Sequence, residues 1–263
     1  MQLQDIIYYF GYGLCHQMPE RSLQSDGLYF AVCARDTGIH IGFAVALAVA
    51  LFGFLRRHRL HKPVPGDLPV MPVMLALLLA LVPMALDGFS SYMGLRETTN
   101  LMRYVTGAIA GIGLGTLFAP ALAASSAFTD HDRPAFSKAP ELFWQLAGST
   151  VLAALFYLLH PLLAALAPLI AIIALLAVFV SINMLVLATT VIKKPLSGWL
   201  TWLPWLAVSL AATIVELALL ALFRHFVINK LTGLGELTAY LPTLLRQSKS
   251  EQLATGFRGN LTH

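Results

Sequence analysis

Charged side chains are scarce in this chain. They make up 11% of its 263 residues, whereas hydrophobic side chains make up 58%. Because about 25% of the residues of a soluble domain are charged, this composition excludes an ordinary soluble protein. The apolar residues fall in blocks of roughly 20, the length that a helix needs to cross the hydrocarbon layer of a membrane. The alternation of barrel strands is absent, so the sequence predicts an all-α fold, a polytopic helical membrane protein.

Several familiar motifs are missing as well. The chain has no phosphate-binding loop, dinucleotide fingerprint, HExxH pair or serine nucleophile elbow. Its two cysteines, Cys15 and Cys33, do not form the CxxC pair of membrane thiol oxidases. No cationic segment precedes an apolar core at the N-terminus, as it would in a secretory signal peptide. These absences exclude the mechanisms that depend on those motifs.

The net charge of +4 does not indicate a nucleic-acid partner. The densest basic group follows an apolar block directly, without interleaved aromatic residues, and consists of Arg56, Arg57, Arg59 and Lys62. A cationic cluster beside a membrane span is typical of a topology signal.

Six membrane-spanning helices are expected from the apolar blocks. They cover approximately residues 39–55, 70–86, 101–124, 142–159, 166–192 and 200–222. Residues 1–13 are too short to span, and their tyrosines favour the headgroup zone, so they are expected to form a half-inserted or interfacial helix. Gly107, Gly111 and Gly115 recur every four residues in the third span. Such a stripe lets two helix backbones approach closely, and we interpret it as packing.

Three parts are expected along the chain. Residues 1–124 form a motif-bearing core with three spans, and residues 125–227 form a three-span extension. Residues 228–263 form a polar, amphipathic tail along the membrane surface.

The orientation follows from the distribution of Lys and Arg. The loops after the first, third and fifth spans are basic, and the positive-inside rule makes them cytoplasmic. The N-terminus and the connection 87–100 are then exoplasmic, in the plasma membrane of a prokaryote. The basic C-terminal tail would also lie outside, which argues against this orientation.

Two polar groups of side chains lie beside the first three spans. One lies in residues 14–42 and consists of Cys15, His16, Cys33, Arg35 and Asp36. The other consists of Asp87, Arg96, Glu97, Asn100 and Arg103. The predicted topology puts both on one membrane face, and we expect them to converge on one pocket.

The same two segments resemble a family of small predicted membrane proteins of unknown function. The first reads CHQMPERS…VCARDTGIHIGF and the second LDG…GLRETTNLMRYVTGAIAGIGLG. The family signature reads approximately CHQ…RS…CARCTGIxxG, then DG…GxRxxTNxxRxxTG. The match covers roughly residues 10–120. The resemblance implies a membrane fold but no activity, and the last three spans are expected to extend the family's core.

The chain departs from the family pattern at Asp36, where the signature has a cysteine. An aspartate cannot form a disulfide, but it can bind a metal. Zinc accepts Cys sulfur, His nitrogen and Asp oxygen in tetrahedral sites, and a hard carboxylate argues against Cu(I). We therefore expect a zinc site with four ligands in two pairs: Cys15, His16, Cys33 and Asp36.

Other interpretations of the cysteines stay open. In an oxidising compartment Cys15 and Cys33 would most simply form a structural disulfide, and both could also remain free thiols. A closed site with four protein ligands would be structural, because catalysis needs an open position on the metal. A catalytic site would therefore leave His16 or Asp36 out of the ligand set.

Four arginines near the two polar groups suggest an anionic ligand. They are Arg21, Arg35, Arg96 and Arg103. Guanidinium groups bind phosphate and carboxylate through paired hydrogen bonds, so a lipid phosphate is a candidate. Asp87 would then serve as a metal ligand or general base. Alternatively, these arginines pair with nearby acids or anchor the helices among lipid headgroups.

Two further polar residues are predicted within the spans. Glu216 lies in the middle of the sixth, where a lone carboxylate is by default a functional candidate. Asn183, in the fifth, is expected to form an interhelical hydrogen bond. A packing role for Glu216 is an equal alternative.

Three functions are consistent with these features. The first is a membrane metalloprotein that performs hydrolysis or group transfer on an anionic, lipid-linked substrate, with Asp87, Arg35, Arg96 and Arg103 beside the zinc. The second is a transporter or flippase for an anionic small molecule or lipid that uses Glu216. The third is a structural membrane protein stapled by a Cys15–Cys33 disulfide.

Overall fold

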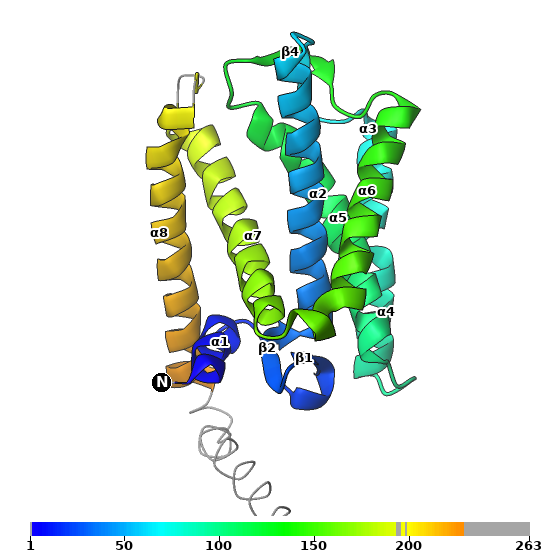
Figure 1. Cartoon of the computed structure of the whole chain (residues 1–263), viewed down its shortest axis with the longest axis vertical. Coiled ribbons are helices and arrows are strands. Elements are labelled where there is room, and N and C mark those ends of the chain that lie inside the picture. Colours follow the sequence, from blue (N-terminus) through cyan, green and yellow to red (C-terminus); the bar gives the residue numbers. More distant parts are fainter. Residues whose placement is uncertain (1, 193–195, 198, 229–263) are drawn as a thin grey trace, which may run out of the picture.

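The computed structural model describes residues 2–192, 196–197 and 199–228, and the predicted tail lies almost entirely outside this range. Six helices in the described part are long and apolar enough to cross a membrane, which confirms the predicted fold class. They cover Ala34–Arg59, Met71–Tyr92, Asn100–Ala123, Ala139–Leu163, Leu166–Thr190 and Leu200–Val227. Figure 1 shows them as a bundle with α2 near its centre.

The first half of the chain contains the helices α1 to α5 and three of the four strands. The helices are α1 (Leu3–Tyr12), α2 (Ala34–Arg59), α3 (Met71–Leu79), α4 (Val82–Tyr92) and α5 (Asn100–Ala123). The strands are β1 (Ser22–Ser25), β2 (Leu28–Cys33) and β3 (Val64–Asp67), and a 3-10 turn (Pro19–Arg21) precedes β1.

The described part of the second half is helical apart from one strand and its connecting turns. Its elements are β4 (Thr129–Pro134), α6 (Ala139–Leu159), a 3-10 turn (His160–Leu163), α7 (Leu166–Thr190), α8 (Trp199–Phe223) and a π-helical turn (Arg224–Ile228).

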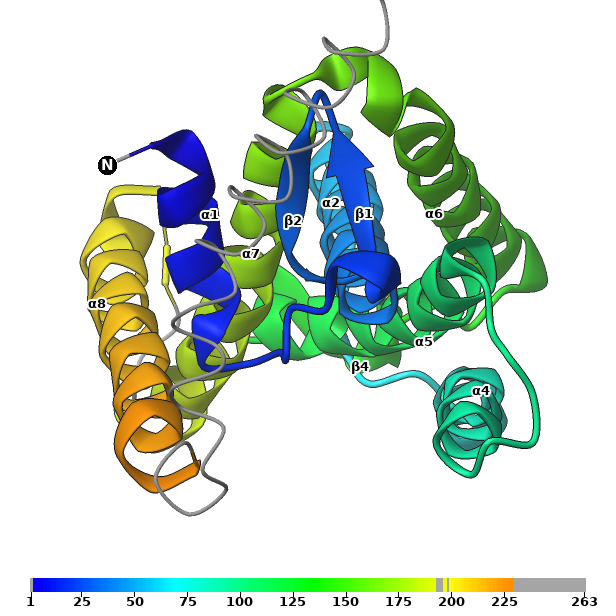
Figure 2. The ribbon, with the colours of Figure 1, turned by 90° about the horizontal axis from the view of Figure 1, so that it is seen from below.

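An antiparallel hairpin, β1–β2, lies across one end of the bundle, where the sequence analysis expected no strand. Ser25 pairs with Leu28, so the connecting loop has two residues, Asp26 and Gly27. Both have positive φ, 50° and 76°, as an Asp-Gly turn of type I′ requires. Figure 2 shows the hairpin beneath α2, with α1 beside α7 and α8.

The glycine stripe of α5 packs directly on α2. A Cβ added at Gly107, Gly111 or Gly115 would come closer than 3.0 Å to a backbone carbonyl oxygen of α2. Gly38 and Gly42 of α2 face the backbone of α5 in the same way. The two backbones are therefore in direct contact, and the stripe serves packing as predicted.

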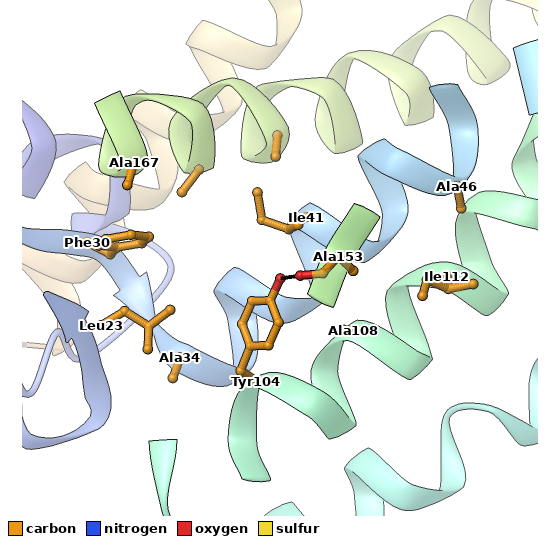
Figure 3. Packing of buried hydrophobic residues seen from close by; sticks show 12 residues of the cluster. Leu23, Phe30, Ala34, Ile41, Ala46, Tyr104, Ala108, Ile112, Ala153 and Ala167 are labelled. Carbon is orange, nitrogen blue, oxygen red and sulfur yellow. Dashed lines mark hydrogen bonds between the residues drawn. The ribbon is translucent and has the colours of Figure 1, made fainter. Parts of the chain in front are cut away.

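Tyr104 links α5 to α6 inside the main hydrophobic cluster. Its ring is 2% exposed, and its hydroxyl donates a hydrogen bond of 2.8 Å to the carbonyl oxygen of Ala153. Phe30 of the hairpin and Ile41 of α2 belong to the same cluster (Figure 3). The hairpin is thus part of the core that α2, α5, α6 and α7 share.

The second span differs from its prediction at both the middle and the end. It breaks into α3 and α4 between Leu79 and Val82, where Pro83 occupies the first turn of α4. It continues to Tyr92 rather than ending at residue 86, so Asp87 lies within a helix and is 2% exposed. Two arginines compensate the charge of this carboxylate, which is why the helix can contain it.

The opposite end of the bundle joins two of the basic loops. β3 follows α2, β4 follows α5, and the two strands pair in parallel. The loops after the first and third spans therefore share a side, as expected. Which side faces the cytoplasm stays a prediction from charge alone.

Candidate metal centre and arginine cluster

Three candidate ligands meet where the hairpin leads into α2. The sulfur atoms of Cys15 and Cys33 and a carboxylate oxygen of Asp36 all lie within 4.8 Å of one another. Cys33 ends β2 and caps α2, and Asp36 lies in the first turn of that helix, so their spacing of three residues puts them on one face. The chain turn after α1 supplies Cys15. The cluster therefore depends on the hairpin, which folds Cys15 back beside Cys33.

Hydrogen bonds connect the three groups. The backbone N–H of Cys33 donates to the Cys15 sulfur over 3.3 Å. The single thiol proton of Cys33 has two acceptors in reach, Asp36 Oδ2 at 3.3 Å and the Cys15 sulfur, and it stabilises the Cys15 thiolate when it is donated to Cys15. Both cysteines are free thiols in the structure.

The two thiols differ in acidity. Hydrogen bonding from the Cys33 thiol, with smaller contributions from backbone N–H groups, lowers the pKa of Cys15 to about 7 against the opposing effect of burial. The pKa of Cys33 is raised, because its thiol hydrogen bonds to Cys15, it is buried, and Asp36 is negative. Cys15 is therefore the more acidic of the two thiols, the one that ionises first.

His16, the fourth predicted ligand, does not belong to this group. Its side chain is exposed, and only Cys15, Cys33 and Asp36 meet the distance condition within the described residues. The structure thus brings together three candidate ligands rather than the four that were predicted. A tetrahedral metal bound by three protein groups keeps a fourth position open.

Two residues that the sequence analysis did not single out hold Cys15 in place. Gln17 has a φ of 55°, and its Nε2 donates to the carbonyl oxygens of Tyr8 at 2.7 Å and Ala31 at 2.9 Å. The Arg224 guanidinium donates to the carbonyl oxygens of Tyr12 and Cys15 and lies 4.5 Å from the centre of the Tyr12 ring. Gln17 follows Cys15 by two residues, within the CHQ motif, and this position was a signal. No sequence feature near Cys15 indicated Arg224.

Asp87 is held by two arginines from different segments. Arg35 Nη2 donates to Oδ2 at 2.5 Å and Arg96 Nη2 to Oδ1 at 2.6 Å. The Asp87 side chain is 1% exposed, against 18% for Arg35 and 44% for Arg96. Arg35 Nε is buried and has no hydrogen-bond partner among the described residues. Asp87 therefore orients both guanidinium groups.

Arg103 completes the arginine cluster. Its Nη1 donates to Asn100 Oδ1 at 3.0 Å, and Asn100 in turn donates to the carbonyl oxygen of Ser22 at 3.2 Å. The Arg103 guanidinium lies near enough to Arg21, Arg35 and Asp87 for their charges to interact. The two polar groups predicted from the sequence therefore meet at one end of the bundle.

The charge of this region is unbalanced. Four arginines (Arg21, Arg35, Arg96 and Arg103) stand against three acids of the two polar groups (Asp36, Asp87 and Glu97), an excess of one positive charge before Cys15 ionises. Glu97 is exposed and forms no ion pair within the described ranges. An arrangement of this kind attracts anions.

The intramembrane polar residues contact one another between α7 and α8. Asn183 Nδ2 donates to Glu216 Oε2 at 3.0 Å and lies 3.1 Å from the hydroxyl oxygen of buried Thr213. The interhelical role expected for Asn183 is therefore present.

Comparison with known proteins gives two relatives and one family. The family described as "Predicted membrane protein (DUF2085)" matches residues 15–117. An uncharacterised protein of Methanothermobacter thermautotrophicus is 42% identical over 104 residues, which are 40% of this chain and 83% of that protein. An uncharacterised protein of Methanocaldococcus jannaschii is 40% identical over 108 residues, 41% of this chain and 63% of that protein, less than two thirds of its length. No solved structure matches the chain.

Proposed function

Because this chain belongs to the DUF2085 family of predicted membrane proteins, and the region it shares with that family contains Cys15, Cys33 and Asp36, we propose that these residues form a Zn²⁺ site. The protein is an integral membrane protein, and the site would lie at the end of its bundle where the hairpin meets α2. The observation that carries this proposal is the convergence of three ligand atoms within 4.8 Å.

The ligand set suits zinc. Thiolate and carboxylate ligands at about 2.0–2.3 Å in a tetrahedron stand roughly 3.3–3.8 Å apart, so small side-chain rotations bring the three atoms to metal-binding distance. The low pKa of Cys15 favours the thiolate that a metal needs. Metal binding would also displace the proton that Cys33 holds.

An open fourth position points to catalysis rather than a purely structural role. Bound at such a site, zinc polarises a substrate oxygen or supplies activated water. The surplus arginines would hold an anionic group beside it. We propose hydrolysis or group transfer on an anionic, lipid-linked substrate, since the site lies at the end of membrane spans.

Within this proposal Asp87 is a positioning residue rather than a general base. Both of its oxygens already accept hydrogen bonds from arginines. A carboxylate paired on both sides is a weak proton acceptor. Its role would be to aim Arg35 and Arg96.

Metal analysis of the purified full chain tests the zinc site. We expect about one zinc per chain, lost in Cys33→Ala and Asp36→Ala and retained in His16→Ala. The His16 variant is the matched control, because it removes a neighbouring candidate ligand that the structure leaves outside the group. Absence of stoichiometric metal, or equal metal content in all variants, would refute the proposal.

A second candidate function is transport of an anionic solute or lipid. The contact between Asn183 and Glu216 favours it, because a carboxylate within membrane spans is expensive and usually functional. Uptake into proteoliposomes that is lost in Glu216→Gln and kept in Cys33→Ala would support transport over catalysis at the thiol cluster.

A further inference from the structure

A cavity of about 620 Å³ lies between the C-terminal half of α2 and the N-terminal half of α6. It is at the opposite end of α2 from the Cys15–Cys33–Asp36 cluster. A helix of 26 residues is about 39 Å long, so the cavity is separate from the proposed metal site. Its use does not depend on the function proposed there.

The floor of the cavity is apolar and open toward the outside of the bundle. Val49, Phe52 and Gly53 of α2 and Trp144 of α6 line it. Phe52 and Trp144 are each 70% exposed. A Cβ at Gly53 would meet nothing within 4 Å. In a membrane, this surface faces hydrocarbon, so the floor can accept an acyl chain.

The rim of the cavity is basic, and its charge is not neutralised. Arg56, Lys62 and Lys138 line it, are exposed, and form no ion pair with any described residue. The one acid of the lining, Glu141, is bound by Arg57 at 2.9 Å. The Nε of Arg57 also donates to the carbonyl oxygen of Pro63, so this pair fixes the rim and leaves three cations for a ligand.

The helix ends indicate how deep the rim and the floor of the cavity lie in the membrane. The rim lies where α2 ends at Arg59 and α6 begins at Ala139, which is the level of the headgroups. Phe143 and Trp144, just over one turn into α6, are exposed where the headgroup layer meets the hydrocarbon, a boundary that aromatic side chains favour. The floor begins one turn of α2 deeper, in the hydrocarbon.

We propose that this cavity is a binding site for an anionic phospholipid. The phosphate would pair with Arg56, Lys62 and Lys138, and an acyl chain would run from the rim past Trp144 and Gly53 toward Val49. The apolar floor favours a lipid over a free anion, and the three unpaired cations favour an anionic headgroup over a zwitterionic one. Basic pockets between membrane helices are known to select anionic headgroups in this way.

Native mass spectrometry of the detergent-purified full chain tests the site. The probes are phosphatidylglycerol and phosphatidylcholine with identical acyl chains, added in equal amounts. We expect the wild type to retain phosphatidylglycerol preferentially. A cation that pairs with the headgroup is worth about five-fold in anionic binding, so Lys62→Gln and Lys138→Gln, which remove cations of the lining, should each lower the preference by about that factor.

Arg59→Gln is the matched control. Arg59 is exposed and belongs to the same basic segment, but it does not line the cavity. Its loss should leave the preference within about two-fold of the wild type. Equal binding of both lipids by the wild type, or an equal loss in Arg59→Gln, would overturn the proposal.

Gly53→Leu tests the acyl-chain part of the site without changing charge. It fills the open floor, so retention of phosphatidylglycerol should fall while the melting temperature stays at or above that of the wild type. Unchanged retention, or full displacement of the lipid by soluble glycerol phosphate, would instead show an anion site without a lipid groove.

Discussion

Arg224 donates a hydrogen bond to the carbonyl oxygen of Cys15, 209 residues earlier in the chain. The end of the last described helix thereby fixes the turn that carries the first candidate ligand. The region matched by the family ends at residue 117, so the extension of this chain contributes a support to the site that lies outside the shared region.

Loss of Arg224 should loosen this turn. Hydrogen bonds from charged groups contribute about 1.5–3 kcal/mol each, and Arg224 makes two to carbonyl oxygens. We expect Arg224→Ala to lower the free energy of unfolding by at least that amount and to speed alkylation of Cys15. Arg133→Ala is the control, because its ion pair with Asp130 is exposed and worth about 0–1 kcal/mol. Equal effects in the two variants would show that Arg224 acts only as a surface charge.

The reactivity of Cys15 should depend on pH near neutrality. Alkylation requires the thiolate, and the pKa of Cys15 is lowered to about 7 mainly by the Cys33 thiol. In chelator-treated protein, the rate of iodoacetamide labelling at Cys15 should therefore fall as the pH drops through about 7. Cys33 should stay unlabelled across this range, since its pKa is raised. Mass spectrometry of labelled peptides measures both.

The Cys33→Ala variant gives the decisive comparison for this reactivity. Removing the hydrogen-bond donor should shift the labelling midpoint of Cys15 upward, toward that of an ordinary thiol at about 8.5. A midpoint that stays near 7 in the variant would contradict the proposed cause.

Because Asp87 pairs with Arg35 and Arg96, replacing it should lower the free energy of unfolding substantially. Breaking a buried ion pair by removing one partner typically costs about 3–5 kcal/mol, because the other charge stays uncompensated. Asp87→Asn leaves Arg35 without its carboxylate, so we expect a loss of this size in unfolding measurements. Glu141→Gln, whose pair with Arg57 is about 30% exposed on each side, should cost about 1 kcal/mol or less.

The two arginines should not contribute equally. Arg35 is 18% exposed and Arg96 is 44% exposed, so solvent screens the second pair more. Arg35→Gln should therefore destabilise the protein more than Arg96→Gln. The reverse order would show that burial does not decide the strength of these pairs.

The glycines of α5 and α2 should tolerate no side chain where the backbones touch. Gly111→Leu should prevent folding or force the helices apart, because even a Cβ would meet α2 closer than 3.0 Å. Gly53→Ala, in the same α2 but facing open space, should stabilise by up to about 1 kcal/mol through helix propensity. Thermal unfolding in detergent distinguishes the two.

The spans were predictable because length and hydropathy alone determine which segments can cross a membrane. The packing role of the glycine stripe could also be predicted, since a spacing of four residues puts small side chains on one helix face. The hairpin was missed although Asp26–Gly27 between Leu23 and Phe30 carries its turn signal. The cysteines and charged residues of 14–42 indicate a site, and this interpretation overlooks the strand pattern on either side of the turn.

The candidate site was only partly predictable for a different reason. The residue types at Cys15, Cys33 and Asp36 suggested metal binding, but only the folded chain shows that His16 is exposed and lies outside their group. Asp87 looked like a loop residue because a charge normally ends a span, and the two arginines that compensate it come from other segments. Arg224 is remote from Cys15 in sequence, and no local sequence pattern predicts its hydrogen bond to the Cys15 carbonyl oxygen.

The direct backbone contact between α2 and α5 limits how this protein can move. With no side chains between the glycine positions and the opposing carbonyl groups, the two helices cannot slide or tilt past each other by changing rotamers. They would move as one rigid body that carries Cys33, Asp36, Arg35 and Arg103 together. Any rearrangement that opens the site must therefore occur in the peripheral elements, in α1 with its turn or in α4, around a fixed pair of helices.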